Sequence, residues 1–364
     1  MKTMPAARLA RSVMNIICAT AIVAGVGFPN WLKAAEPQPT SSSDNNLALD
    51  PAIYHHVAQV IWVVRDIDRV VAYWEKLGIH NVHRDGTLSF PSLTYRGKPD
   101  RAKARQVTAR VDQLEIKWIQ PVRGGKFWRD ALRKHGDGIR VMGYAARSRQ
   151  EFDDQLKYFA SRNVGVVVED SWQGHDGQGR IAYLDTATQG GENTIALIDD
   201  PDARSHQPDP ATGNEYPVAK ITHFAWVVND DRKVDAYYTS LGFKPFSAMD
   251  HNKSLDRIYR NQPGTYEMWL GWDRTGDAPF EWIQQITGPD VYVEYGKNHG
   301  EGFHHIGVNV TDMDEAIKIM TARGAPPSQS AAWQTSKGKG RAVYLDTDPY
   351  GGVTLELIYD PNHQ

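Results

Sequence analysis

The chain has 364 residues, of which 41% are hydrophobic and 10% aromatic, an ordinary globular composition with room for about two domains. Its formal net charge is -3, and it contains no long basic run. The sequence therefore gives no electrostatic basis for binding nucleic acid.

The N-terminus has the pattern of a secretory signal peptide. Lys2, Arg8 and Arg11 precede an apolar run over residues 13–28, and Ala34 and Ala35 follow it. We expect residues 1–35 to be a signal peptide and the mature protein to be periplasmic or secreted, with no membrane attachment after cleavage. Lys33 stands where a small residue is preferred for cutting, so an uncleaved anchor is the alternative, although the run is short for a membrane span.

The signal segment contains Cys18, the only cysteine of the chain. Removing the segment leaves a mature chain that can fold in an oxidising compartment without disulfide errors, and that gains no stability from disulfides. Residues 36–52 follow, and the Ser-rich part from Pro37 to Asn46 predicts a flexible tether.

The rest of the chain is an internal repeat. The segments 59–66, 71–78 and 117–120 recur at a spacing of 164 positions, as from Gln59 to His223. Two domains are therefore expected at residues 53–201 and 220–362. Residues 202–219 between them are rich in Pro, Asp and Ala and predict a linker.

Each half is itself double, with four quarters at about 53–122, 138–201, 220–287 and 302–361. Every quarter begins with a strand, continues as an amphipathic helix and closes with strands. In the third quarter, Val234, Tyr238 and Leu241 have helical spacing and Gly242 is a helix stop. The pattern predicts an α+β fold of four βαβββ modules, paired into two domains.

Four strands of the second half each carry one ionisable residue in an apolar context. The four are His223, Glu281, His305 and Glu356. Ionised carboxylates in buried strands need partners, which a metal ion shared with the two histidines would supply and an Arg or Lys would supply otherwise. Two imidazoles and two carboxylates suit Zn²⁺, Ni²⁺, Co²⁺, Mn²⁺ or Fe²⁺.

Strict alternation along these strands predicts what else faces the site. From His305 to Val310 it places His305, Gly307 and Asn309 on the site face, and it groups His304 with the opposite, apolar face. By the same alternation Gln285 accompanies Glu281. We expect Gln285 and Asn309 to orient a small-molecule substrate, with Tyr344 and Tyr350 near the last strand as further donors.

Two phrases of the second half, residues 300–306 and 344–357, are similar to strings of the vicinal oxygen chelate superfamily. This superfamily includes glyoxalase I, methylmalonyl-CoA epimerase, extradiol dioxygenases and bleomycin resistance proteins, and the resemblance covers nearly all of the chain after Ile53. It implies that each pair of modules curls into a cup around one metal ion. It also implies that His223, Glu281, His305 and Glu356 are the metal ligands.

The same resemblance makes the first half a degenerate copy of the site. The matching positions there carry Gln59, Lys117, Val141 and Ala196. A lysine would place a positive charge where the metal ion would sit, and Val141 and Ala196 offer no donor atom. We expect residues 53–201 to bind no metal at this place.

Three functions remain open. The first is a metal-dependent isomerase or lyase that stabilises an enediolate, in which the resemblance to glyoxalase I nominates Glu281 or Glu356 to move the proton. The second is an Fe(II) extradiol ring-cleavage dioxygenase that uses His223, His305 and Glu356 as a facial triad. The third is a non-enzymatic small-molecule-binding protein of the resistance type. A monomer and a homodimer are both compatible with four modules in one chain.

Overall fold

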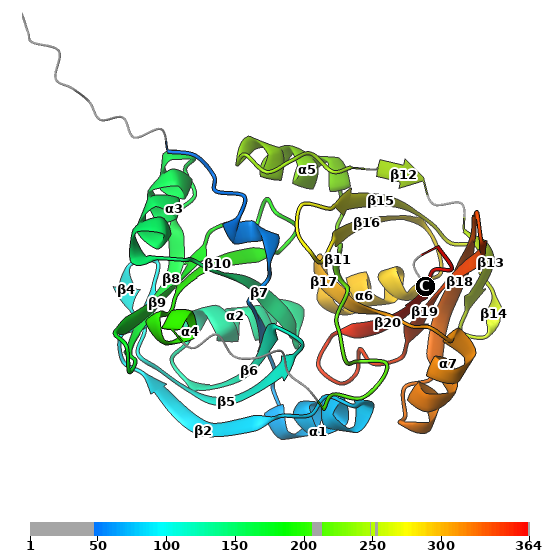
Figure 1. Cartoon of the computed structure of the whole chain (residues 1–364), viewed down its shortest axis with the longest axis horizontal. Helices are drawn as coiled ribbons and strands as arrows, with labels where there is room; N and C mark the ends of the chain where they lie inside the picture. The colour runs from blue at the N-terminus through cyan, green and yellow to red at the C-terminus, as the bar shows by residue number, and fades with distance from the viewer. Residues whose placement is uncertain (1–46, 206–212, 248, 252–253, 363–364) are drawn as a thin grey trace, which may run out of the picture. The chain divides into compact units, whose positions relative to one another are not determined.

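The first half of the chain forms one curled sheet with its helices (Figure 1). The computed structural model describes residues 47–205, 213–247, 249–251 and 254–362. The elements of the first half are η1 (Ile53–His55), β1 (Gln59–Val63), α1 (Ile67–Leu77), β2 (His83–Phe90), β3 (Thr94–Tyr95), β4 (Lys98–Pro99), β5 (Ala102–Val111), β6 (Leu114–Arg123), α2 (Lys126–His135), β7 (Gly138–Ala145), α3 (Arg149–Ser161), β8 (Val166–Gln173), β9 (Gln178–Leu184), β10 (Thr194–Asp199) and α4 (Pro201–Ser205).

The second half repeats this succession. Its elements are β11 (His223–Val227), α5 (Asp231–Ser240), β12 (Met249–His251), β13 (Leu255–Tyr259), β14 (Gln262–Pro263), β15 (Glu267–Asp273), β16 (Phe280–Thr287), α6 (Val291–His299), β17 (Gly302–Asn309), α7 (Met313–Ala322), β18 (Pro327–Thr335), β19 (Gly338–Leu345) and β20 (Thr354–Tyr359).

Both sheets have ten strands in the same relative order. The first runs β2-β5-β6-β1-β7-β10-β9-β8-β3-β4, and the second runs β12-β15-β16-β11-β17-β20-β19-β18-β13-β14. Each sheet joins two modules through the antiparallel pair of their first strands, β1 with β7 and β11 with β17. The predicted α+β fold of four βαβββ modules is confirmed.

The first helix of each half begins and ends at the residues that the sequence pattern indicates. Asp66 caps α1 by accepting a hydrogen bond from the Arg69 N–H, and Asp230 caps α5 in the same way through the Lys233 N–H. After α1 the chain turns at Gly78 with φ of 115°, a left-handed conformation that glycine adopts without steric cost.

Three hydrophobic clusters form the core of the molecule, one shared by both halves and one within each half. The largest contains side chains of both halves, from Trp62 and Trp74 of the first to Trp226 and Trp282 of the second. The other two lie on the concave sides of the sheets, here called the first cup and the second cup. Helix α2 lies within the curve of the first sheet and α6 within that of the second (Figure 1).

The contact between the halves has an approximate twofold symmetry. His135 at the end of α2 donates from Nδ1 to the carbonyl of His299 at 2.7 Å, and His299 returns the same bond to the His135 carbonyl at 2.7 Å. The loop before the last strand of each half also contacts the first helix of the other half. Trp74 of α1 donates to the Tyr350 carbonyl, and Tyr238 of α5 donates to the Gly190 carbonyl.

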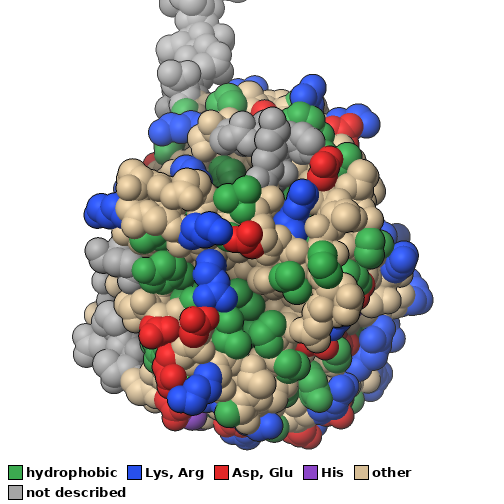
Figure 2. Space-filling model, turned by 90° about the vertical axis from the view of Figure 1, so that its right-hand side faces the viewer, with side chains coloured by type: hydrophobic (Ala, Val, Ile, Leu, Met, Phe, Trp, Pro, Cys, Tyr) green, Lys and Arg blue, Asp and Glu red, His purple; other side chains and the backbone are tan. Residues whose placement is uncertain are grey.

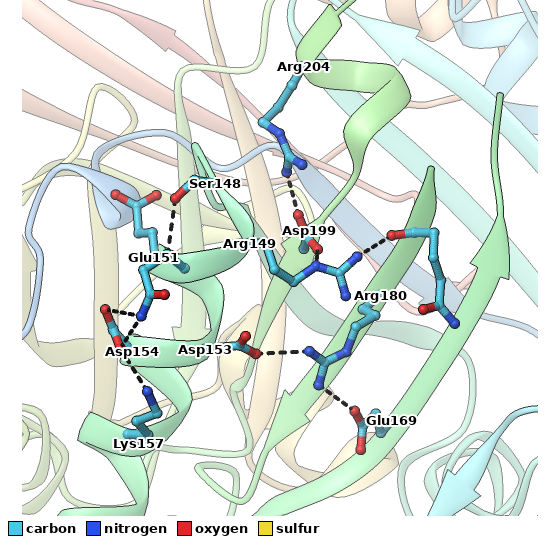
Figure 3. A network of polar contacts seen from close by, with 12 residues as sticks. Ser148, Arg149, Glu151, Asp153, Asp154, Lys157, Glu169, Arg180, Asp199 and Arg204 are labelled. Carbon is cyan, nitrogen blue, oxygen red and sulfur yellow. Dashed lines mark hydrogen bonds and ion pairs between the residues drawn. The ribbon is translucent and has the colours of Figure 1, made fainter. Parts of the chain in front are cut away.

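A polar network fastens the outer helices of the first half to its sheet (Figure 3). Asp199 at the end of β10 is fully buried and pairs with Arg149 of α3 and Arg204 of α4. Arg180 of β9 bridges α3 and β8, because its guanidinium contacts Asp153 at 2.9 Å and Glu169 at 2.8 Å. These pairs lie on the convex side, away from the first cup.

Several sequence predictions lie wholly or partly outside the described residues. They are the signal peptide at 1–35, the tether up to residue 46 and the middle of the linker at 206–212. In the described part of the chain, no helix has the length and apolarity that a membrane span requires.

Candidate metal centre

The four predicted donor residues lie on four neighbouring strands of the second sheet. Glu281 is on β16, His223 on β11, His305 on β17 and Glu356 on β20, and these strands are adjacent in that order. One donor atom from each residue lies within 4.8 Å of the others. No other group of three or more His, Cys, Asp or Glu side chains gathers in this way among the described residues.

Three of the donors form a tight set and the fourth lies slightly apart. His223 Nε2 is 2.9 Å from Glu356 Oε2 and 3.0 Å from His305 Nε2, and His305 Nε2 is 3.1 Å from the same carboxylate oxygen. Glu281 Oε2 lies 3.4 Å from His305 Nε2. All four residues are at most 5% exposed, so their donor atoms converge in a buried site.

Register places further residues beside these donors. A row of directly opposed residues crosses five strands of the second sheet: Gln329, Tyr344, Glu356, Gly307 and His223. Gly307 is needed for space, because a Cβ atom at this position would lie 1.7 Å from the His223 ring. The glycine therefore lets the imidazole lie over β17 and reach the other donors.

Opposite charges within the cluster shift each other's pKa values. Burial lowers the pKa of His305, but the carboxylates of Glu356 and Glu281 outweigh it and raise that pKa to about 9. Burial raises the pKa of Glu356, yet His305 and His223 hold it well below its usual range. Two buried carboxylates facing imidazole nitrogens at these distances are a donor set that fits a divalent cation.

A β-bulge brings a third histidine to the cluster. Ala225 lies opposite His305 and Trp226 lies opposite Phe303, so His304 is the extra residue of the bulge. Its ring packs against Tyr292 and Tyr344 in the second cup. The prediction from strict alternation that His304 faces away from the site is therefore wrong, because the bulge interrupts the alternation.

His304 makes hydrogen bonds on both sides of its ring. Its Nδ1 lies 2.8 Å from His305 Nδ1, and the Val291 carbonyl accepts a hydrogen bond from the ring. Burial and the neighbouring His305 hold the pKa of His304 well below its usual value, so its ring is neutral. With one nitrogen donating to Val291, Nδ1 of His304 accepts the proton of His305 Nδ1, which leaves His305 Nε2 free to bind a metal ion.

The cluster opens into a cavity of about 700 Å³. Aromatic side chains form much of its wall, among them Trp272, Trp333 and Tyr266, and the Arg274 guanidinium lies 4.6 Å from the centre of the Trp272 ring. An apolar wall with a few polar groups is the usual form of a small-molecule site.

Two of the four predicted substrate contacts lie on this cavity. Tyr344 lines it and accepts a hydrogen bond from the Tyr292 hydroxyl at 2.8 Å, and Asn309 lines it near its rim beside Thr222. Gln285 is further along β16, where its side chain lies beside Gly288 rather than on the cavity wall.

Tyr350 corrects a prediction. Its ring is stacked on Tyr73 of α1 with centroids 3.8 Å apart, and the Arg69 guanidinium lies over its other side at 4.8 Å. Tyr350 therefore joins the two halves and does not line the cavity. The sequence places it close to the last strand, but the loop that carries it turns towards the first half.

The structure also shows cavity residues that the sequence reasoning missed. Tyr292 lies on α6 inside the second cup, and Gln329 lies on β18 opposite Tyr344. A signal for Gln329 was available in the repeat, because the matching residue of the first half is Val168, which lies opposite Tyr183. The polar residue in place of an apolar one could have marked Gln329 as a candidate site residue.

The first cup has the same register with other side chains. Its corresponding row is Val168, Tyr183, Ala196, Gly143 and Gln59, and Lys117 and Val141 flank Ile61 where Glu281 and His305 flank Ala225. Val141, Val168 and Ala196 belong to the apolar cluster that includes Trp128 of α2. Lys117 Nζ lies 3.6 Å from Glu115.

The outer face of the second half carries charges of both signs. On the side shown in Figure 2, lysine and arginine alternate with acidic and hydrophobic side chains. The single-sign surface that would attract a polyanion is not seen on this face.

Comparison with known proteins supports the fold and the family. Residues 222–344 match the sequence model of the Glyoxalase/Bleomycin resistance protein/Dioxygenase superfamily. No curated protein sequence is similar enough to match this chain.

Solved structures with a similar fold include a triple mutant of 4-hydroxymandelate synthase from Streptomyces coelicolor. It is 14% identical, with a TM-score of 0.56, and the match covers 84% of this chain and 92% of that one. A Mn(II)-bound glyoxalase from Novosphingobium aromaticivorans matches at 13% identity and a TM-score of 0.45, over 84% of this chain and 82% of that one. At these identities the likeness concerns the fold.

Proposed function

We propose that the second half of this chain, whose residues 222–344 match the model of the Glyoxalase/Bleomycin resistance protein/Dioxygenase superfamily, is a metal-dependent isomerase or lyase. The observation that supports the proposal is the buried cluster of His223, Glu281, His305 and Glu356. Three of its residues, His223, Glu281 and Glu356, line a cavity of about 700 Å³. The reaction would move a proton on the carbon next to a substrate carbonyl group.

The four cluster residues would hold the divalent cation. Lewis-acid stabilisation of a negatively charged substrate oxygen is the chemistry that a cation bound there supplies. The remaining tasks belong to side chains of this chain, which must bind the substrate, exclude water and move the proton.

Glu281 is the better placed of the two carboxylates to move a proton. Glu356 Oε2 is held by both imidazoles at 2.9 and 3.1 Å, whereas Glu281 Oε2 has one imidazole contact at 3.4 Å. Its carboxylate would accept the proton from the substrate carbon and return it to the neighbouring carbon or to the leaving position. The negative charge that forms on the substrate oxygen then needs a donor.

Tyr344 can supply that donor. Its hydroxyl oxygen accepts a hydrogen bond from Tyr292, so its own proton is available to an oxygen in the cavity. Burial raises the pKa of Tyr344 well above its usual value, so the hydroxyl stays protonated over the working pH range. Tyr344 lies directly opposite Glu356, one strand from the metal ligands.

One experiment tests both the metal and the proton transfer. The purified protein, Glu281→Gln and His305→Ala would be analysed for bound metal, and their catalysis of deuterium exchange into hydroxyacetone and 2-hydroxyacetophenone in D₂O would be followed by NMR. We expect metal and exchange in the parent protein, little metal in His305→Ala, and no exchange in Glu281→Gln even when metal is added back. A parent protein that retains no metal after reconstitution would refute the proposal.

A second candidate rests on the asymmetry of the cluster. His223, His305 and Glu356 form the tight set, as a facial triad requires, and Glu281 lies apart from it. An Fe(II) dioxygenase would keep its iron and its oxygen consumption with catechol in Glu281→Gln. The same variant thus separates the two functions. Binding without turnover in either assay would favour the non-enzymatic binding protein.

A further inference from the structure

Gln329 is a buried polar residue of the cavity that none of the proposed steps uses. It lies on β18, is 2% exposed, and lines the same cavity as Glu281 and Glu356. Its side-chain nitrogen Nε2 has no hydrogen-bond partner among the described residues. A buried amide donor without a partner costs free energy, and in a cavity wall a ligand can remove that cost.

The orientation of this amide is fixed by the backbone. The Val291 N–H at the start of α6 donates to Gln329 Oε1 at 3.1 Å. Because an N–H group needs an oxygen acceptor, the amide is held with its oxygen towards α6 and its NH₂ group away from it. The donor is thus aimed by α6 rather than free to rotate.

Register gives the position of this donor relative to the metal cluster. Gln329 lies opposite Tyr344 on β19, and Tyr344 lies opposite Glu356 on β20. Neighbouring strands are about 4.8 Å apart, so the backbone of Gln329 is about 10 Å from that of Glu356 on the same concave side. A substrate oxygen that meets the Gln329 amide is therefore separate from the oxygens that meet the metal ion.

The first half shows that the fold itself does not need a polar residue here. The matching residue Val168 is 2% exposed and packs in the apolar cluster of the first cup, opposite Tyr183. The polar residue occurs only in the half with the donor cluster.

We infer that Gln329 Nε2 binds an uncharged acceptor oxygen of the substrate, a ketone, amide or hydroxyl oxygen several bonds from the metal-chelating pair. An uncharged acceptor fits because Asp290, the residue before Val291, is a fully buried carboxylate whose field would repel an anion. The aromatic wall of Trp272 and Trp333 fits a flat or apolar body between the two ends. This inference rests on the proposed metal function and adds the substrate class.

The test uses two probes of similar size that share one chelating end. They are 3,4-dihydroxyacetophenone, which carries a ketone oxygen, and 4-ethylcatechol, which does not. Calorimetry would measure binding of each probe to the Co²⁺-loaded and the metal-free protein, for the parent, Gln329→Met and Gln334→Met. Gln334 lies on the same strand in solvent and is the matched control.

We expect Gln329→Met to lower the affinity for the ketone probe about tenfold more than the affinity for 4-ethylcatechol. Gln334→Met should change neither affinity. Equal weakening of both probes, or no change, would overturn the inference, as would failure of both probes to bind in any state. If binding of the probes does not depend on Co²⁺, the proposed metal-dependent function is refuted. A loss of affinity in Gln329→Met that is confined to the ketone probe would still support Gln329 Nε2 as a hydrogen-bond donor to the ligand. Gln329→Glu, which keeps the acceptor for Val291, replaces the Met variant if that one does not fold.

Discussion

The two cups of this protein share one backbone plan and differ in what their inner residues can do. At equivalent register the first cup has Gln59, Lys117, Val141 and Ala196, and the second has His223, Glu281, His305 and Glu356. The first is filled by an apolar cluster around Trp128, whereas the second leaves a cavity of about 700 Å³ above its donors.

The difference shows that two sheets with the same strand order and register can hold an apolar core or a cluster of metal-donor groups, depending on a few inner side chains. Each β-bulge follows the same register shift, yet the bulge residue is Arg140 in the first half and His304 in the second. Arg140 donates to backbone carbonyls of the loop before β7, which ties that loop down. His304 instead contacts a predicted metal ligand, so one irregularity of the backbone serves stability in one half and a site in the other.

The largest expected effect comes from exchanging equivalent residues between the cups. His305→Val removes one of four predicted ligands, and we expect metal affinity to fall by about a thousandfold or more. Val141→His places an imidazole in the apolar cluster and should lower the free energy of unfolding by about 3 kcal/mol without changing metal content. Metal analysis after dialysis and urea unfolding measure the two quantities.

The opposite pattern would break the comparison between the cups. Loss of metal in Val141→His would mean that the first cup takes part in the site. Unchanged metal affinity in His305→Val would remove His305 from the ligand set.

The second effect concerns the side chain that fills the first cup. Trp128 is 3% exposed and lies 5.3 Å from the Phe90 ring, centre to centre. We expect Trp128→Ala to lower the free energy of unfolding by about 3 kcal/mol, because it removes a large buried ring and leaves a void. Metal content and catalysis should not change, since Trp128 belongs to the half without donors.

Rescue by a small ligand sharpens this prediction. A dry apolar void can bind an aromatic molecule of its shape, so indole should raise the thermal midpoint of Trp128→Ala and not that of the parent protein. A loss of metal on mutation would instead show that the filling of the first cup supports the second site.

The third effect tests the bulge residue of the second half. His304→Leu removes the acceptor for His305 Nδ1, and we expect metal affinity to fall by about 10- to 100-fold with the fold intact. His304→Gln, whose amide oxygen can accept the same proton, should restore part of the affinity. Arg140→Met, the matched change in the first half, should lower stability and leave metal affinity unchanged.

Equal metal affinity in the parent and His304→Leu would show that His304 only packs. Competition with a chromophoric chelator measures all three variants. Circular dichroism confirms that each one is folded.

Much of this architecture could be predicted because it repeats. The spacing of 164 positions from Gln59 to His223 identified the halves, and it led to the four donors that the structure brings together. Their role as metal ligands remains a prediction. Alternation along a strand is reliable where the ladder is regular, as at His223 and Glu356.

The sequence analysis misplaced or missed side chains whose position depends on tertiary packing or on an irregularity of the backbone. A bulge cannot be recognised from alternation, so His304 was placed on the wrong face. Tyr350 sits in a loop whose direction is set by its stacking on Tyr73 of the other half. Gln329 comes near the donors through strand pairing over 27 residues of chain, which local pattern does not reveal.

The smallest effect is a pH dependence of stability that belongs to the first half. Burial raises the pKa of Asp170 on β8 from 3.8 to about 6, and Lys117 opposes this only in part. The folded state therefore holds a proton that the unfolded state has lost between pH 4 and 6, so stability falls as the pH rises through this range and then levels. The matching residue of the second half, Ala331, carries no charge and lines the cavity.

Asp170→Asn should remove this fall in stability. The effect of the substitution on the free energy of unfolding should be about 1 kcal/mol more favourable at pH 7 than at pH 4. This figure is reduced because the carboxyl group is partly solvated. Urea unfolding at several pH values measures the difference. Asp154→Asn is the control, since Gln150 and Lys157 lower the pKa of that exposed carboxyl and its removal should not stabilise at pH 7. If Asp170→Asn destabilises at pH 7, the attraction between the Asp170 carboxylate and Lys117 outweighs the cost of burial, and opposite charges add to the stability of the first half besides its apolar filling.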